Sequence, residues 1–277
     1  MQILLENEKK SKRKKEVQKW TFYDLFSEDT YSMNYSTVLI TGANRGIGLE
    51  LVKQMASLSD PPTHIFATSR HPDKATILNE LASKSSNIHV IECDVKNEES
   101  VAQLVSQVAC HVGSNGLSLL INNAAIAFKH SLSTVNVHDL MDNYHVNAVA
   151  PLMITKQMLP LLKLSAENGR KTLVVNISST LGSIAKYRKI CVGDYQYTYR
   201  ASKAALNMIT RCLWVELKES KISVVAICPG WVQTDMGAPD ADLTPTESVA
   251  GLLSTINHLN EEDGGKFFTF DGKPNPW

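Results

Sequence analysis

The chain has 277 residues, of which 43% are hydrophobic and 20% are charged, and its formal net charge is zero. This length suits one large α/β domain, and the balanced charge gives no electrostatic reason to expect a nucleic-acid partner. Because the sequence contains no apolar run of about 18 residues, we expect no membrane span.

The five cysteines show no paired spacing, and the eight histidines form no cluster with metal-ligand spacing. An odd number of cysteines without a disulfide framework suits a reducing compartment. We therefore expect a cytoplasmic protein with no bound metal.

Residues 1–35 are predicted to be a flexible basic extension, followed by one domain over residues 36–277. The basic run at residues 11–15 is open to two interpretations, a localisation or anionic-surface signal and a solvated tail, and we favour the tail. Because Met33 stands just before the first predicted strand, we expect residues 1–32 to be dispensable.

From residue 36 onward, short apolar runs alternate with helical patterns. Runs rich in Val, Ile and Leu that are separated by helices predict one doubly wound parallel sheet, Rossmann-like, with helices on both faces. Ligands then bind at the carboxyl ends of the strands. Strands are predicted at 37–40, 64–67, 88–91, 117–121, 173–177, 222–228 and 266–270. Helices are predicted at 47–58, 74–82, 98–111, 140–164, 198–219 and 246–259, with Pro151 bending or breaking the fourth.

A glycine-rich turn connects the first predicted strand to the first predicted helix, with the spacing G-x3-G-x-G. Such glycines let the backbone approach a pyrophosphate, and the helix N-terminus supplies free N–H groups. A plain tight turn is the alternative. We expect a nicotinamide dinucleotide to contact Gly42, Asn44, Arg45, Gly46, Ile47 and Gly48 here.

Two arginines favour NADPH over NADH. The second predicted strand ends in Thr-Ser-Arg70, without the acidic residue that accepts a ribose 2′-hydroxyl in NAD sites. Arg45 lies within the glycine turn itself, and two guanidinium groups near the 2′ position suit a 2′-phosphate.

Polar and small residues follow the third and fourth predicted strands. Asp94, with Val95 beside it, is a candidate partner for adenine, and Asn123 and Ala124 are expected to pass under the cofactor. For Asp94 and Asn122 a role in stabilising the turn remains equally open.

Tyr199 and Lys203 are spaced so that they share one face of a helix. A neighbouring ammonium stabilises a phenolate and so lowers the pKa of the phenol, which allows proton transfer near neutral pH. Of the four tyrosines at 187, 195, 197 and 199, only Tyr199 has a lysine four residues later.

Together these motifs resemble the short-chain dehydrogenase/reductase family, over residues 36–277. The motif T-G-x3-G-x-G stands at Thr41–Gly48, N-N-A-G at 122–125 with Ala125 in place of Gly, and Y-x3-K at Tyr199 and Lys203. Within that family, residues 229–236 resemble the carbonyl reductases. The C-terminal motifs are similar to the sniffer-type carbonyl reductases and the related C-factor group, and they are residues 264–268, Asp271-Gly272 and Pro276-Trp277.

The resemblance implies roles for further residues. Ser179, the second serine of Asn-x-Ser-Ser, is implied to hydrogen-bond the substrate carbonyl, in preference to Ser178. Asn147 is implied to bend its helix and to hold a water that links Lys203 to solvent. Cofactor contacts are implied for Pro229, Gly230, Val232, Thr234, Tyr199 and Lys203, and the family usually forms homodimers or homotetramers.

One departure from the family is that Tyr199 comes 20 positions after Ser179, a longer gap than is usual. The extra length predicts a surface loop, carrying residues 186–191, that shapes the substrate entrance. Trp231, Met236, Ile126 and Tyr187 suggest an apolar pocket, although core packing explains each equally well.

The leading interpretation is an NADPH-dependent reductase of a small carbonyl substrate, such as an aldehyde, ketone or quinone, with Tyr199 as proton donor. One alternative is an NAD(P)-dependent hydroxysteroid or alcohol dehydrogenase. Another is a cofactor-binding signalling protein whose catalysis is incidental, against which the complete Tyr199–Lys203 pair argues.

Overall fold

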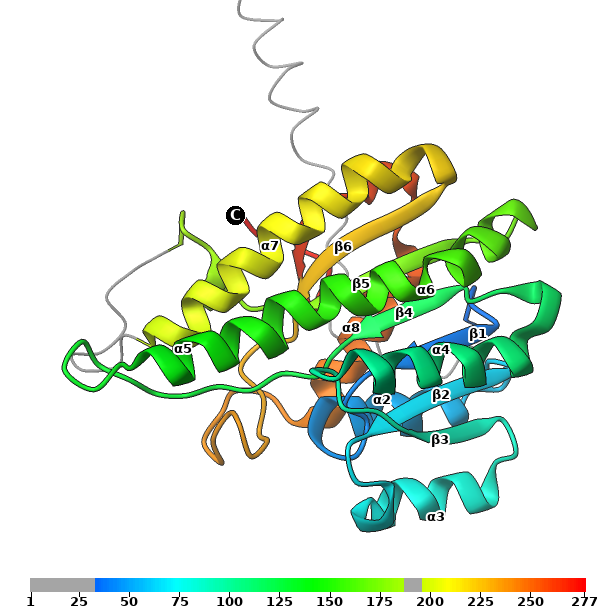
Figure 1. The fold of residues 1–277 in the computed structure, drawn as a ribbon, viewed down its shortest axis with the longest axis horizontal. Coiled ribbons are helices and arrows are strands. Elements are labelled where there is room, and N and C mark those ends of the chain that lie inside the picture. Colours follow the sequence, from blue (N-terminus) through cyan, green and yellow to red (C-terminus); the bar gives the residue numbers. More distant parts are fainter. Residues whose placement is uncertain (1–32, 187–195) are drawn as a thin grey trace, which may run out of the picture.

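The computed structural model describes residues 33–186 and 196–277. Within these residues the chain forms a seven-stranded parallel sheet in the order β3-β2-β1-β4-β5-β6-β7 (Figure 1). Because the strand order reverses between β1 and β4, the predicted doubly wound sheet is confirmed. The strands are β1 (Thr37–Ile40), β2 (His64–Ser69), β3 (Ile88–Glu92), β4 (Leu119–Asn122), β5 (Thr172–Ile177), β6 (Ile222–Cys228) and β7 (Phe267–Thr269).

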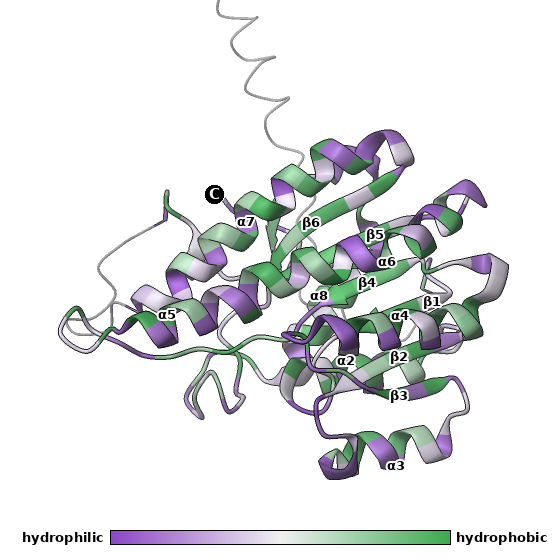
Figure 2. Cartoon of the chain, viewed as in Figure 1, coloured by the Kyte–Doolittle hydropathy of each residue, from purple (hydrophilic) through white to green (hydrophobic). Residues whose placement is uncertain are grey.

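The sheet is covered on both faces, and each face has its own apolar core. One core contains Leu51 and Met55 of α2 and Leu252 of α8, whereas the other contains Leu104 of α4 and Met158 of α6. Figure 2 shows hydrophobic strands between helices whose faces alternate in hydropathy. Burial on both sides explains why the strands are continuous apolar runs. The helices are α2 (Gly46–Ala56), α3 (Thr76–Lys84), α4 (Glu98–Val112), α5 (Val137–Tyr144), α6 (Ala150–Glu167), α7 (Tyr197–Leu217) and α8 (Pro245–His258).

The predicted helix at 140–164 is interrupted where Pro151 was expected to disturb it. A π-helical turn, η3 (His145–Val149), joins α5 to α6, and the N–H of Ala150 donates to the carbonyl of His145. Proline has no N–H to donate, so the first turn of α6 is a position where Pro151 is tolerated.

The domain begins earlier than predicted. Tyr35 is fully buried in the core beside α8, and its hydroxyl lies 3.5 Å from the carbonyl oxygen of Ile256. Asn34 donates its main-chain N–H to the side chain of Asn257 at 3.1 Å. Residues 33–35 therefore belong to the folded domain and not to the extension.

Two predicted features lie outside the described residues. They are the basic run at 11–15, within residues 1–32, and most of the predicted entrance loop, residues 187–195. In the part of the chain that the structure covers, no helix is both long and apolar enough to cross a membrane.

Candidate active site

The glycine turn after β1 depends on backbone conformations that glycine alone adopts freely. Gly42 and Gly46 have φ values of +66° and +56°. A Cβ atom on Gly48 would collide with the carbonyl oxygen of Gly42, and one on Gly42 would stand 2.9 Å from the Cα of Ala124. The turn is therefore held against the segment after β4 with no room for a side chain between them.

Asn123 and Thr41 lock these two segments together. The Nδ2 of Asn123 donates to the carbonyl oxygens of Thr41 at 2.9 Å and Gly42 at 3.0 Å. In return, the hydroxyl of Thr41 accepts from the main-chain N–H groups of Asn123 and Ala124, both at 3.0 Å. The side chain of Asn123, expected to contact the cofactor, thus braces the turn.

The N-terminus of α2 is equipped to hold an anion. Its N-cap residue, Arg45, makes no side-chain cap, and the first turn carries no acidic side chain. The first N–H groups of a helix have no partner within the helix, and the helix dipole favours negative charge at this end. A turn without Cβ atoms that leads into such a helix end fits a pyrophosphate.

The two arginines expected to favour NADPH stand on the surface near this turn. The Nη1 of Arg45 lies 2.8 Å from the Oδ2 of Asp235, and both side chains are exposed. Arg70, exposed, directly follows β2. The loop after β6 reaches the same turn, since a Cβ on Gly46 would lie 3.3 Å from the methyl group of Thr234.

The remaining predicted cofactor residues lie in the glycine turn, at the start of α2 and in the loops after β3 and β6. Asn44 is exposed, and Ile47 and Val95 pack against the two cores. Asp94 stabilises its own turn, because its Oδ1 accepts the N–H of Lys96 at 3.0 Å. After β6, the carbonyl oxygen of Pro229 accepts from Ser248, Gly230 has a φ of +85°, and Val232 is buried.

Tyr199, Lys203 and Ser179 converge at the carboxyl end of β5. Tyr199 and Lys203 lie on α7, and the Lys203 Nζ stands 5.7 Å from the centre of the Tyr199 ring. The same Nζ donates to the carbonyl oxygen of Ile177 at 2.7 Å. The Ser179 side chain lies beside the Tyr199 phenol, close enough to influence its pKa.

Burial controls the protonation of this group. It raises the pKa of the Tyr199 phenol above its usual value, against a smaller lowering by the hydrogen bond from Ser179. It also lowers the pKa of Lys203 to about 8. The expected lowering of the phenol pKa by Lys203 is therefore not found, because desolvation of the phenolate dominates. Tyr199 is a protonated phenol at neutral pH, the form that an acid catalyst needs.

The two adjacent serines have different surroundings. The hydroxyl of Ser178 is buried and donates to the Oδ1 of Asn207 at 2.6 Å. The hydroxyl of Ser179 accepts from the N–H of Leu181 and reaches Tyr199. Of the two, Ser179 is the one beside the phenol.

Asn147 lies in the π-helical turn η3 between α5 and α6. Its Oδ1 accepts the N–H of Ile126 at 2.9 Å, while its Nδ2 donates to the carbonyl oxygen of Ile126 at 2.8 Å and to the hydroxyl of Ser202 at 3.0 Å. Asn147 thus ties the segment after β4 to α7.

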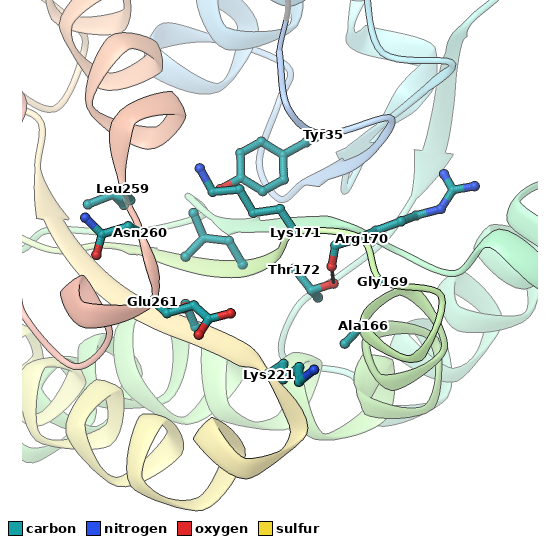
Figure 3. A pocket seen from close by; sticks show the side chains of 12 residues that line it. Tyr35, Ala166, Gly169, Arg170, Lys171, Thr172, Lys221, Leu259, Asn260 and Glu261 are labelled. Atoms are coloured by element: carbon teal, nitrogen blue, oxygen red, sulfur yellow. Dashed lines mark hydrogen bonds between the residues drawn. The ribbon is translucent and has the colours of Figure 1, made fainter.

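A pocket of about 480 Å³ lies at the opposite end of the sheet (Figure 3). Its lining includes Tyr35, Lys171, Thr172, Lys221 and Glu261, and none of the predicted site residues. Lys171 lies over the Tyr35 ring at 5.2 Å and donates to the carbonyl oxygen of Asn257. Asn257 lies in the last turn of α8, where a cation complements the helix dipole.

Comparison with known proteins agrees with this geometry. A sequence model described as short chain dehydrogenase matches residues 36–243. The chain belongs to the short-chain dehydrogenase family. The carbonyl reductase Sniffer of Drosophila melanogaster is 39% identical, with a TM-score of 0.84 over 87% of this chain and 99% of that one. An NADPH-bound carbonyl reductase from chicken fatty liver is 41% identical, with the same TM-score and coverage. The C-signal protein of Myxococcus xanthus is 38% identical over 61% of this chain and 98% of its own length.

One residue beside the site of this short-chain dehydrogenase was missed from the sequence. Cys228, at the end of β6, is 5% exposed. Its thiol lies close enough to Tyr199 and Lys203 to influence the pKa of both groups. The sequence could have indicated this residue, because it stands at the carboxyl end of a predicted strand and directly before Pro229-Gly230.

Proposed function

We propose that this short-chain dehydrogenase is an NADPH-dependent carbonyl reductase. The observation that carries the proposal is the convergence of Ser179, Tyr199 and Lys203 at the same end of the sheet as the glycine turn. The similarity to two carbonyl reductases at about 40% identity supports it.

The glycine turn and the N-terminus of α2 would hold the pyrophosphate. Arg45 and Arg70 would hold a 2′-phosphate, Asp94 and Val95 the adenine, and the loop at 229–234 the nicotinamide, with Tyr199 and Lys203 at the ribose. NADPH supplies a hydride for the carbonyl carbon when it is bound.

The chain's own residues manage the proton. The Tyr199 phenol donates its proton to the substrate oxygen as negative charge develops there, and the Ser179 hydroxyl donates a hydrogen bond to the same oxygen. With a pKa of about 8, Lys203 is largely protonated at neutral pH, so its charge opposes the cost of the phenolate left on Tyr199. A water link between Asn147 and Lys203 stays a prediction, as does the homodimer or homotetramer.

A hydroxysteroid or alcohol dehydrogenase would use the same residues in the reverse direction, and the two arginines favour reduction with NADPH. The similarity to C-signal keeps a signalling role as a second candidate. A protein that only bound a cofactor would have no need for a phenol, a hydroxyl and an ammonium in this arrangement.

The test is NADPH oxidation by the purified protein with a panel of aldehydes, ketones, quinones and ketosteroids, repeated with NADH. The proposal expects turnover of at least one carbonyl class and a clear preference for NADPH. Binding of NADPH without turnover of any carbonyl would favour the signalling role instead.

A further inference from the structure

The segment that carries Ser179 leaves β5 and is held on one side by α7. Its short helical turn η4 (Thr180–Gly182) packs so closely on α7 that a Cβ on Gly182 would lie 2.7 Å from the carbonyl carbon of Lys203. On the same side, the Nδ2 of Asn207 donates to the carbonyl oxygen of Gly182 at 3.3 Å. Helix α7, which carries Tyr199 and Lys203, thus fixes this side of the Ser179 segment.

The other side is held by residues 273–277, which the proposed chemistry leaves without a role. After β7 the chain turns back, and the N–H of Asn275 donates to the carbonyl oxygen of Phe267 at 2.7 Å. The Ser183 hydroxyl then donates to the carbonyl oxygen of Pro276 at 2.6 Å, and the N–H of Ala185 to that of Trp277 at 2.9 Å. In Figure 1 the chain end marked C lies beside the segment that follows β5.

Trp277 anchors the 273–277 segment to the sheet. Its ring stacks on Phe267 of β7, with centroids 5.4 Å apart and planes inclined by 24°. Phe267 is 2% exposed, so the anchor is attached to a rigid strand.

A chain of hydrogen bonds runs from this segment toward Tyr199 and Lys203. The Nδ2 of Asn275 donates to the hydroxyl of Thr180 at 3.0 Å, and that hydroxyl donates to the Sγ of Cys228 at 3.3 Å. Cys228 neighbours Tyr199 and Lys203, and Thr180 directly follows Ser179. Asn275 therefore bonds directly to the residue that follows Ser179 and, through the hydroxyl of Thr180, reaches the thiol beside Tyr199.

The hydrogen bonding of Asn275 indicates a role beyond general stability of the fold. The residue is 5% exposed, yet its Oδ1 has no hydrogen-bond partner among the described residues. A buried acceptor without a partner is destabilising, so an amide that leaves its oxygen unpaired is a poor device for stability alone.

We propose that Asn275, anchored through Trp277, is a positioning residue that holds Ser179 against Tyr199 by fixing Thr180 to Cys228. This inference rests on the proposed reductase function. It concerns geometry in the protein itself, however, and can be measured without turnover.

The experiment compares Asn275→Ala with Thr180→Val, which removes the bridging hydroxyl and keeps the shape of the side chain. Asn87→Ala is the matched control, because it also removes one side-chain amide that donates a hydrogen bond, in this case to the carbonyl oxygen of Pro62 at 2.9 Å and away from the site. The readouts are the rate of Cys228 labelling by Ellman's reagent, followed by peptide mass spectrometry, and kcat and KM for NADPH with a quinone.

Both site variants should label Cys228 about tenfold faster than wild type and lose about tenfold in kcat, with KM for NADPH nearly unchanged, since small displacements of reacting groups cost rate more than binding. Asn87→Ala should leave labelling and kcat as in wild type. Unchanged labelling in either site variant, or equal changes in the control, overturns the inference. If the wild type reduces no carbonyl, the reductase proposal fails, and the labelling rates still decide the positioning.

Discussion

The ammonium nitrogen of Lys203 stands 5.7 Å from the centre of the Tyr199 ring, one helical turn along α7. Ser179 arrives from the end of β5 beside the phenol, and the Lys203 Nζ donates to the carbonyl oxygen of Ile177 on the same strand. A proton donor, a second hydrogen-bond donor and a cation thus share one small region at the carboxyl edge of the sheet. This relationship connects the fold to the proposed chemistry, and the predictions below test its parts.

Replacing Ser179 should impair the chemical step. Ser179→Ala removes a hydrogen-bond donor to the developing negative charge, so we expect kcat to fall by about 10²–10³. Ser178→Ala is the matched control, because its hydroxyl contacts Asn207, away from the phenol. That variant should lose about 1 kcal/mol of stability and keep most of its kcat. Steady-state kinetics and urea unfolding check both, and the opposite pattern would assign the role to Ser178.

The two arginines should determine cofactor preference. Arg45→Ala and Arg70→Ala each remove a charge-assisted contact to a 2′-phosphate, so the Kd for NADPH should rise about tenfold while that for NADH stays the same. Fluorescence titration of both dinucleotides measures this. Lys53→Ala, an exposed cation on α2, serves as the control. Equal weakening of NADPH and NADH by the arginine variants would contradict the assignment.

The glycine turn should not tolerate a side chain. Gly42→Ala and Gly169→Ala both force alanine into positive φ, +66° and +71°, at a cost of about 1–2 kcal/mol. Only Gly42 would also meet a neighbour, the Cα of Ala124 at 2.9 Å, whereas nothing lies within 4 Å of Gly169. We expect a larger loss of Tm in Gly42→Ala, together with loss of NADPH binding, and full binding in Gly169→Ala. Similar behaviour of the two variants would exclude a steric role for the turn.

Buried Lys203 should make stability depend on pH. Its pKa is lowered from 10.5 to about 8, so between these values the unfolded chain binds more protons and stability rises with pH. From pH about 8 to about 9.5 this contribution amounts to about 1.5 kcal/mol. Lys203→Met should lack it, so its stability relative to wild type should fall by that amount over the same range. Urea unfolding at the two pH values checks this. Parallel pH profiles of the two proteins would show that folding does not lower the pKa of Lys203.

The fold could be predicted from the sequence because its strands and helices are marked by local residue patterns. Each predicted strand overlaps an observed one, since Val, Ile and Leu runs bounded by turns are what a doubly covered sheet requires. The Tyr199–Lys203 pair was also readable, because helical spacing alone selects one tyrosine of four.

Features that depend on contacts between distant parts of the chain could not be predicted from the sequence. Tyr35 was placed in the extension because its burial comes from α8, more than 200 residues away in the chain. The bracing role of Asn123 depends on the adjacency of β1 and β4. The sign of the Tyr199 pKa shift depends on desolvation by the assembled domain, which outweighs the lowering by Ser179.

The central claim is that Tyr199 gives the proton, and Tyr199→Phe tests it most directly because it removes only the phenolic oxygen. With a carbonyl that the wild type reduces, we expect kcat to fall by about 10²–10⁴ while the Kd for NADPH, measured by fluorescence, stays within about threefold of wild type. Turnover by Tyr199→Phe at the wild-type rate, with NADPH bound, would contradict the account.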